Sequence, residues 1–120
     1  MVDGTGLSCF AERFPERYID VGISEEHAVT MCAALAKSGL KPFLCLYSTF
    51  AQRSYDQLLH DVALPSNPIV LCLDRSGVCG ADGRTHQGIY DLAYLGSMPG
   101  FAVCAPATPE NQAQAIRLAS

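Results

Sequence analysis

The sequence predicts an α/β fold in which a mostly parallel β-sheet carries helices on both faces. Short apolar segments of strand length alternate along the chain with longer segments of helical pattern, an order typical of strand–helix–strand units. The strand segments are apolar without interruption, as expected when both faces of a sheet are covered. With 120 residues, the chain is long enough for one domain and too short for two.

The N-terminal part predicts a strand followed by a helix. Residues 18–22 have the length and composition of a short strand. Ser24 is a favourable N-cap, and Gly39 is a typical residue just beyond a helix end. Because the residues between them are apolar on nearly every side, we expect this helix to be buried on more than one face.

Two further strands and a helix follow in the middle of the chain. The segments 42–47 and 69–73 are continuous apolar runs of strand length. Ser48 or Thr49 is the expected cap of the helix between them. This helix carries an apolar stripe at helical spacing, formed by Ala51, Tyr55, Leu58, Leu59 and Val62.

The C-terminal part predicts a loop, a strand and two helices. A glycine-rich loop over 76–88 is followed by a short helix over 90–95 and a fourth strand over 101–105. Thr108 and Pro109 then start the last helix, as cap and first helical residue. The resulting order is strand, helix, strand, helix, strand, loop, helix, strand and helix.

Polar segments follow three of these strands, at 24–27, 47–50 and 74–75. The carboxyl ends of parallel strands meet at one edge of a sheet, where open α/β sheets bind their ligands. We therefore expect these segments to lie together, beside the loop that carries Asp82 and His86.

Composition excludes several classes of function. The net charge is −4 and no run of Lys or Arg occurs, so neither nucleic acid nor an anionic membrane surface is an expected partner. No apolar stretch approaches the ~20 residues that span a bilayer, and the N-terminus lacks a secretion signal pattern. We expect a cytoplasmic protein whose six cysteines are reduced and mostly buried.

Several polar residues allow both a structural and a functional interpretation. Glu25 and Glu26 suit the first turn of a helix, where acids complement its dipole, but one of them could be a general acid or base. The loop over 76–88 is either a flexible connection or a polar substrate cradle. Arg53 and Arg75 are either solvated charges or ligand contacts, and Arg75 at a strand end is a candidate for phosphate.

The histidines do not indicate a metal site. His27, His60 and His86 lack the spacing of zinc ligands, and no cysteine pair supplies the missing partners. We expect no protein metal site in this chain, and a structural role for His60.

Several motifs taken in order resemble the 1-deoxy-D-xylulose-5-phosphate synthase family of thiamine-diphosphate enzymes. They are Asp-Val-Gly-Ile-Ser-Glu-Glu-His-Ala-Val-Thr at 20–30, Tyr-Ser-Thr-Phe-Ala-Gln-Arg-Ser-Tyr-Asp-Gln at 47–57, His-Asp-Val-Ala at 60–63, Asp-Arg-Ser-Gly at 74–77 and Gly-Ala-Asp-Gly-Arg-Thr-His-Gln-Gly at 80–88. The similarity extends from about Gly4 to the C-terminus. It implies a pyrimidine-binding module of the transketolase type.

The resemblance implies a set of cofactor contacts. In that family the residue matching Glu25 bonds a ring nitrogen of the aminopyrimidine of thiamine diphosphate. This contact favours the tautomer that takes the proton from the thiazolium carbon. Phe50 would stack on the pyrimidine, with Tyr47 and Arg53 beside it.

The same resemblance implies substrates and their contacts. The family condenses pyruvate with glyceraldehyde 3-phosphate to give 1-deoxy-D-xylulose 5-phosphate and CO₂. Arg75 would hold the phosphate of the acceptor, while Asp82 and His86 would contact substrate. His86 is the expected proton-transfer residue, since the unperturbed pKa of histidine lies near neutrality.

Family members are several times longer, so residues 1–120 are interpreted as a partial pyrimidine-binding domain. We expect an additional helix and strand before Gly4, a further strand after Ser120, and the Mg²⁺ ligands in another module. The chain alone is expected to be inactive and to bind the cofactor poorly, whereas the full-length enzyme is expected to be a homodimer.

Two other interpretations remain open on the sequence. One is another thiamine-diphosphate enzyme, such as a transketolase or the β component of a 2-oxo-acid dehydrogenase, against which the motif at 80–88 argues. The other is a non-catalytic α/β binding module in which Glu25 is only an acid at a helix start.

Overall fold

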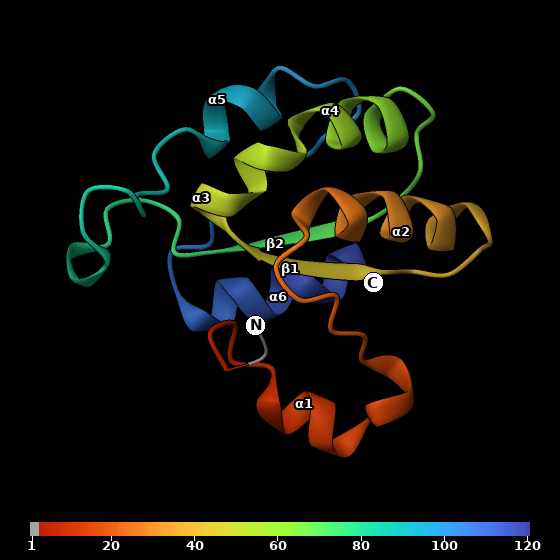
Figure 1. Cartoon of the computed structure of the whole chain (residues 1–120), viewed down its shortest axis with the longest axis horizontal. Helices are drawn as coiled ribbons and strands as arrows, with labels where there is room; N and C mark the ends of the chain where they lie inside the picture. Colours follow the sequence, from red (N-terminus) through yellow and green to blue (C-terminus); the bar gives the residue numbers. More distant parts are fainter. Residues whose placement is uncertain (1–2) are drawn as a thin grey trace.

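Two parallel strands lie at the centre of the computed structural model, which describes residues 3–120. β1 (Phe43–Tyr47) and β2 (Val70–Asp74) pair in register, with Phe43 opposite Val70 and Tyr47 opposite Asp74. Figure 1 shows α3 (Ser48–Ala51), α4 (Tyr55–Gln57) and α5 (Asp91–Gly96) above the strands and α6 (Pro109–Ala119) below them. The mixed α/β class and the parallel pairing are confirmed, for a sheet smaller than the sequence predicted.

The predicted strands over 18–22 and 101–105 are wrong. Both segments are irregular in the structure, and the sheet of the described residues contains β1 and β2 alone. A strand needs a neighbour for its backbone N–H and C=O groups, which an apolar sequence does not supply. Ile19 and Val103, which we placed inside these strands, are exposed.

The first long helix, α2 (Glu25–Lys37), begins and ends where the sequence predicted. Ser24 occupies the N-cap position, but its hydroxyl donates to Val21 O at 2.6 Å and does not cap the helix. At the other end Gly39 adopts φ +90°, and Leu40 N donates to Leu35 O at 3.1 Å. This backward bond in a left-handed turn satisfies a carbonyl of the last turn, and glycine adopts that conformation without a steric cost.

α2 is buried along one stripe, so the expectation of burial on more than one face is wrong. The buried apolar residues recur at helical spacing and all face the same side: Ala28, Val29, Cys32, Ala33 and Ala36. Thr30 and Ala34, on the opposite side, are exposed. Small apolar residues such as alanine fit a solvent-facing helix surface as well as a core, which is why composition alone suggested deeper burial.

The segment after β1 is helical but changes its hydrogen-bond pattern along its length. It consists of α3 (Ser48–Ala51), the 3₁₀ turn η2 (Gln52–Ser54), α4 (Tyr55–Gln57) and the π-type turn η3 (Leu58–Ala63). Neither Ser48 nor Thr49 caps it, because the helix already begins at Ser48. Four of the five stripe residues pack in or against the core, whereas Tyr55 is 44% exposed and contacts the ring of Tyr94 edge-on.

The core lies between α2, η3 and one face of the sheet. Val29 of α2, Leu58 of η3 and Leu44 of β1 are buried there, and Leu95 closes the core from α5 (Asp91–Gly96). This packing fixes the N-terminus of α2 beside the carboxyl ends of β1 and β2. The polar segments at those positions are thereby presented on one edge of the fold.

The remaining elements lie at the periphery. They are α1 (Ser8–Arg13), η1 (Pro15–Arg17), η4 (Gly80–Asp82) and α6 (Pro109–Ala119). The predicted start of α6 is confirmed, since Asn111 N donates to Thr108 Oγ1 at 3.2 Å. α6 packs weakly, and its Leu118 is 89% exposed. Within residues 3–120, no helix has the length and apolar character needed to cross a membrane.

All six cysteines are unpaired thiols. The expectation that most are buried is wrong: Cys32 is buried, whereas Cys9 and Cys104 are exposed and the other three are half-buried. Cys9 and Cys104 lie in peripheral segments that few other residues cover.

Candidate functional site

Seven residues singled out by the sequence form one connected set of contacts at the carboxyl ends of β1 and β2. We call this set the strand-end cluster; its members are Glu25, Tyr47, Phe50, Arg53, Arg75, Asp82 and His86. They come from the start of α2, the end of β1 and the helix after it, the turn after β2, and the loop over 76–88. Their proximity agrees with the expectation from parallel strands.

Glu25 is the buried acid of the strand-end cluster. The residue is only 6% exposed, and its Oε2 lies 3.4 Å from Arg53 Nη1. The guanidinium carbon of Arg53 lies 4.9 Å from the centroid of the Phe50 ring. A buried carboxylate requires a partner, and Arg53 supplies one while it also contacts the aromatic face. An anionic oxygen and an aromatic ring are thus linked by one cation.

Three rings pack together beside this ion pair. Tyr47 and Phe50 are stacked, with centroids 5.7 Å apart and an interplanar angle of 12°. The His86 ring meets Phe50 at 82°, with centroids 5.3 Å apart. Such aromatic pairs contribute about 0.5–1.5 kcal/mol beyond the apolar area that they bury. The contacts hold His86 against the end of β1, although it lies far along the chain.

Arg75 is directed back over the cluster by its backbone. Its φ of +58° is the left-handed conformation, which is uncommon for a residue other than glycine and recurs at functional sites. The guanidinium carbon lies 4.3 Å from the Tyr47 ring centroid, and Nη1 lies 2.7 Å from Asp82 Oδ1. An anion at Arg75 would share the guanidinium with Asp82, which is possible because the group carries five N–H donors.

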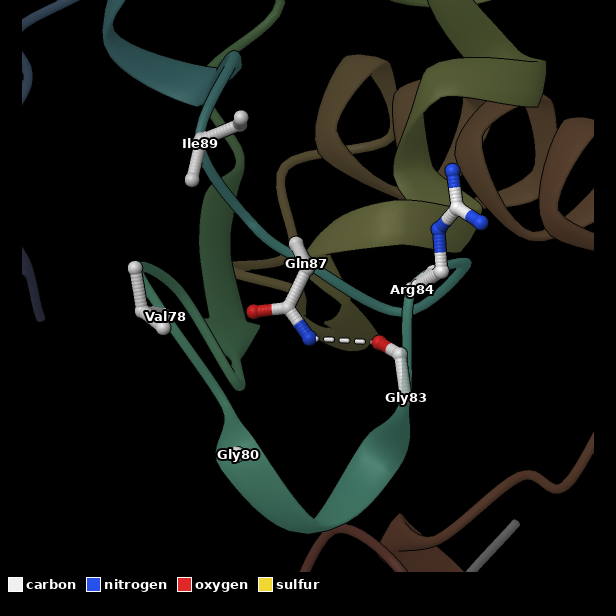
Figure 2. A pocket seen from close by; sticks show the side chains of 6 residues that line it. All are labelled: Val78, Gly80, Gly83, Arg84, Gln87 and Ile89. Carbon is white, nitrogen blue, oxygen red and sulfur yellow. Dashed lines mark hydrogen bonds between the residues drawn. The ribbon is translucent and has the colours of Figure 1, made fainter.

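The loop over 76–88 is closed by its own hydrogen bonds. Gly77 and Gly88 exchange two backbone hydrogen bonds of 2.7 and 2.9 Å at its base. Inside the loop, the Gln87 side chain accepts from Cys79 N and donates to Cys79 O and Gly83 O. Figure 2 shows the Gln87 amide bonded across the loop to Gly83. These bonds support a cradle of defined shape over a flexible connection.

The hollow of about 470 Å³ on this loop is separate from the strand-end cluster. It is lined by Val78, Gly80, Gly83, Arg84, Gln87 and Ile89, none of which belongs to the cluster. In Figure 2 the Arg84 guanidinium points away from the loop tip at Gly80, toward the helices behind it. The residues of the strand-end cluster therefore do not line that hollow; Glu25 and Tyr47 are buried, whereas Arg53 and Arg75 are exposed.

A buried carboxylate beneath the cluster ties its segments together. Asp91 Oδ2 accepts hydrogen bonds of 2.6 Å from both Ser48 Oγ and Ser76 Oγ. Ser48 follows the last residue of β1, and Ser76 follows Arg75. Gly88 is pressed against the same point, since a Cβ there would lie 2.3 Å from Ser48 Oγ and 2.6 Å from Arg75 O. We call Ser48, Ser76, Gly88 and Asp91 the Asp91 hub.

The sequence interpretation missed the Asp91 hub. Its signal is weak: a serine within two residues of each of two strand ends, and an acid at the start of the short helix after the loop. Each residue by itself suits a turn or a helix start, so that only the folded chain shows that they meet.

Threonine hydroxyls position His86 from the other side. Thr49 Oγ1 donates to Thr85 O at 2.9 Å, which joins the start of α3 to the loop. Thr85 Oγ1 lies 2.7 Å from His86 Nδ1. One ring nitrogen of His86 is therefore engaged by Thr85, and the position of the ring is set by Phe50.

The family described as transketolase, pyrimidine binding domain, matches residues 1–120 of the sequence. The chain belongs to this family. Among curated relatives, 1-deoxy-D-xylulose-5-phosphate synthase of Natranaerobius thermophilus is 57% identical over 106 residues, which are 88% of this chain and 17% of the relative. The enzyme of that name from Clostridium perfringens (strain SM101) is 52% identical over 120 residues, which are 100% of this chain and 19% of the relative.

The enzyme of the same name from Dictyoglomus thermophilum is 60% identical over 106 residues, or 88% of this chain and 17% of the relative. The chain thus spans less than a fifth of the length of these relatives. The resemblance to the 1-deoxy-D-xylulose-5-phosphate synthase family is confirmed, and so is the interpretation of the chain as the pyrimidine-binding part of such a protein.

Two half-buried groups of this chain, Asp74 and Tyr94, have shifted pKa values. Burial raises the pKa of Asp74, at the end of β2, against an opposing effect from Arg75. Burial also raises the pKa of Tyr94, as does the neighbouring charge of Asp91. Tyr94 Oη and Asp91 Oδ1 are buried without a hydrogen-bond partner.

No metal site is present in residues 3–120, where no group of three or more His, Cys, Asp and Glu side chains could hold an ion. His60 instead lies 2.9 Å from Asp56 Oδ1, one helical turn earlier.

Proposed function

We propose that this chain binds the aminopyrimidine ring of thiamine diphosphate in a 1-deoxy-D-xylulose-5-phosphate synthase. The complete enzyme would condense pyruvate with glyceraldehyde 3-phosphate to 1-deoxy-D-xylulose 5-phosphate and CO₂. The observation that carries the proposal is the buried Glu25 carboxylate beside the ring of Phe50, joined to it by Arg53. An acceptor oxygen next to an aromatic face fits the edge and the plane of an aminopyrimidine.

Glu25 would accept a hydrogen bond from a ring nitrogen and hold the proton there. Its burial supports this role, because a carboxylate removed from water forms stronger hydrogen bonds than an exposed one. Phe50 would stack on the ring, with Tyr47 and Arg53 beside it. Thiamine diphosphate supplies the carbanion chemistry that the side chains lack, and the protein orients and protonates.

The remaining residues of the strand-end cluster would act on substrate. Arg75 would bind the phosphate of glyceraldehyde 3-phosphate, sharing its donors with Asp82. His86 would transfer a proton, since its ring is held by Phe50 and Thr85. Asp82 would contact substrate beside Arg75.

Arg53 and Arg75 of the strand-end cluster are exposed, and we propose that another module of the same enzyme covers them. That module would contribute the Mg²⁺ ligands for the diphosphate. The assembly would be a homodimer in the cytoplasm, and residues 3–120 alone would not turn over substrate.

The test uses a complete enzyme that contains this segment, assayed with pyruvate and glyceraldehyde 3-phosphate. Glu25→Ala should lower kcat by about 10²-fold or more, the range expected for loss of a group that moves a proton. Glu26→Ala is the matched control, because Glu26 is the adjacent acid and is exposed. Equal activity of the Glu25 variant would refute the cofactor role.

Arg75→Ala tests the substrate assignment separately. Loss of a phosphate contact should raise the KM for glyceraldehyde 3-phosphate while the KM for pyruvate stays unchanged. A parallel rise in both values would contradict the assignment of Arg75 to the acceptor. Failure of the complete enzyme to use this substrate pair would support a transketolase-type or a non-catalytic module instead.

A further inference from the structure

Two of the unpaired cysteines lie side by side on the adjacent strands β1 and β2. Cys45 is the central residue of β1, Cys72 is the central residue of β2, and the two are register partners. Register partners in a parallel sheet point to the same face. They lie on the face opposite to Leu44 and Leu46, which pack in and against the core.

The two cysteines are partly accessible to solvent, and each affects the pKa of the other. Both residues are half-buried. Interaction with Cys72, together with burial, raises the pKa of Cys45, and interaction with Cys45 lowers the pKa of Cys72. Asp74 opposes ionisation of both, and Cys32 and Tyr18 are further titratable neighbours of Cys45. Cys72 is therefore the sulfur that ionises more readily and the better nucleophile.

The backbone spacing permits a bond between them. Neighbouring strands lie about 4.8 Å apart, within the range of about 4.4–6.8 Å between the Cα atoms of a disulfide. Parallel side chains must lean toward each other to bring Sγ onto Sγ, so the bond would be strained. Strained disulfides are reduced more readily than structural ones.

We propose that Cys45 and Cys72 form a redox-sensitive dithiol, which a peroxide converts into a reversible disulfide between β1 and β2. The Cys72 thiolate attacks one oxygen of hydrogen peroxide, giving a sulfenic acid and hydroxide, which a proton converts to water. The Cys45 sulfur then displaces the sulfenic oxygen as a second water. The two thiols lose two protons and two electrons in total, and the peroxide is reduced to two waters.

The modification would act close to the strand-end cluster. Cys45 lies two residues before Tyr47, and Cys72 lies two residues before Asp74. A bond at this point would fix the separation of the strands that carry Tyr47 and Arg75. The proposed disulfide depends on the pairing of β1 with β2 and is independent of the proposed function.

The experiment uses the 120-residue chain with Cys9, Cys79 and Cys104 replaced by serine, which leaves three thiols. We expect hydrogen peroxide to reduce the count of reactive thiols under denaturing conditions from three to one. The intact mass should fall by two hydrogens, and peptide mapping should link Cys45 to Cys72. A mild dithiol reductant should restore all three thiols. Cys45→Ala or Cys72→Ala in this background should abolish the link and leave two thiols.

Other outcomes overturn the proposal. A bridge distributed among all three cysteines, Cys32 included, would show that pairing follows chance encounter and not the register of the sheet. Retention of three thiols, or a sulfenic or sulfinic acid confined to one cysteine, would show that the two sulfurs do not reach each other.

Discussion

Asp91→Ala is the substitution that most directly tests how the strand-end cluster is held together. Asp91 is buried, and its Oδ2 accepts hydrogen bonds of 2.6 Å from Ser48 and Ser76. The substitution removes both acceptor contacts at once. Ser48 is fully buried, so that its hydroxyl would be left in the interior without this partner.

The expected loss can be worked out from these contacts. A hydrogen bond to a charged group contributes about 1.5–3 kcal/mol. The loss of two such bonds is offset in part, because the alanine variant no longer has to transfer a carboxylate from water into the interior on folding. The net decrease in the free energy of unfolding is then about 2–4 kcal/mol, within the range for breaking a buried polar network. A loss of this size is large against the stability of a small domain.

The assay is urea unfolding of the 120-residue chain, followed by far-ultraviolet circular dichroism. Asp56→Ala is the matched control, since Asp56 forms an ion pair with His60 at the surface and its side chain is 76% exposed. It should cost no more than about 0.5 kcal/mol. A double-mutant cycle with Ser48→Ala should give a coupling energy of about 1 kcal/mol. Equal losses for Asp91→Ala and Asp56→Ala, with no coupling to Ser48, would refute the reasoning.

Two further substitutions test neighbouring features. Gly88→Ala should destabilise the chain by about 1–3 kcal/mol, because the added Cβ would meet Ser48 Oγ at 2.3 Å and the carbonyl of Arg75 at 2.6 Å. Asp74→Asn should change the pH dependence of stability. Burial raises the folded-state pKa of Asp74 above 3.8, so the folded state binds the proton more tightly than the unfolded state, and its contribution to stability falls as pH rises through this window. The Asp74→Asn variant should lack this decrease in stability with rising pH.

Each of these substitutions has a control within the chain. Gly96→Ala introduces a Cβ that meets no atom within 4 Å, so it should change stability by less than about 0.5 kcal/mol. Asp56→Asn should leave the pH dependence intact. Equal effects of Gly88→Ala and Gly96→Ala would contradict the tight contact. A pH profile unaltered by Asp74→Asn would show that Asp74 is not the group responsible.

Much of the local structure could be predicted because it depends on neighbouring residues. The end of α2 follows from Gly39, and the start of α6 follows from Thr108 and Pro109. β1 and β2 follow from continuous apolar runs. These features rest on capping, on backbone conformation and on the burial of apolar side chains, all of which a short window of sequence contains.

The errors occurred where a partner decides the structure. An apolar run such as 101–105 has strand composition, but it is a strand only if another strand offers hydrogen bonds to it. The helix after β1 changes from α to 3₁₀ and π patterns, and Tyr55 lies outside the buried stripe, against the ring of Tyr94. The intrinsic helix and strand propensities of the residues do not contain this information about their partners.

The sequence by itself determined which residues are chemically interesting and that parallel strands would gather them at one edge. The tertiary structure decided how they meet: Arg53 between Glu25 and Phe50, and Arg75 between Tyr47 and Asp82. It also decided that Asp91 lies beneath them, joining Ser48 to Ser76. The physical reason is that a side-chain contact depends on the positions of two backbones distant in sequence, and packing of the whole chain alone fixes those positions.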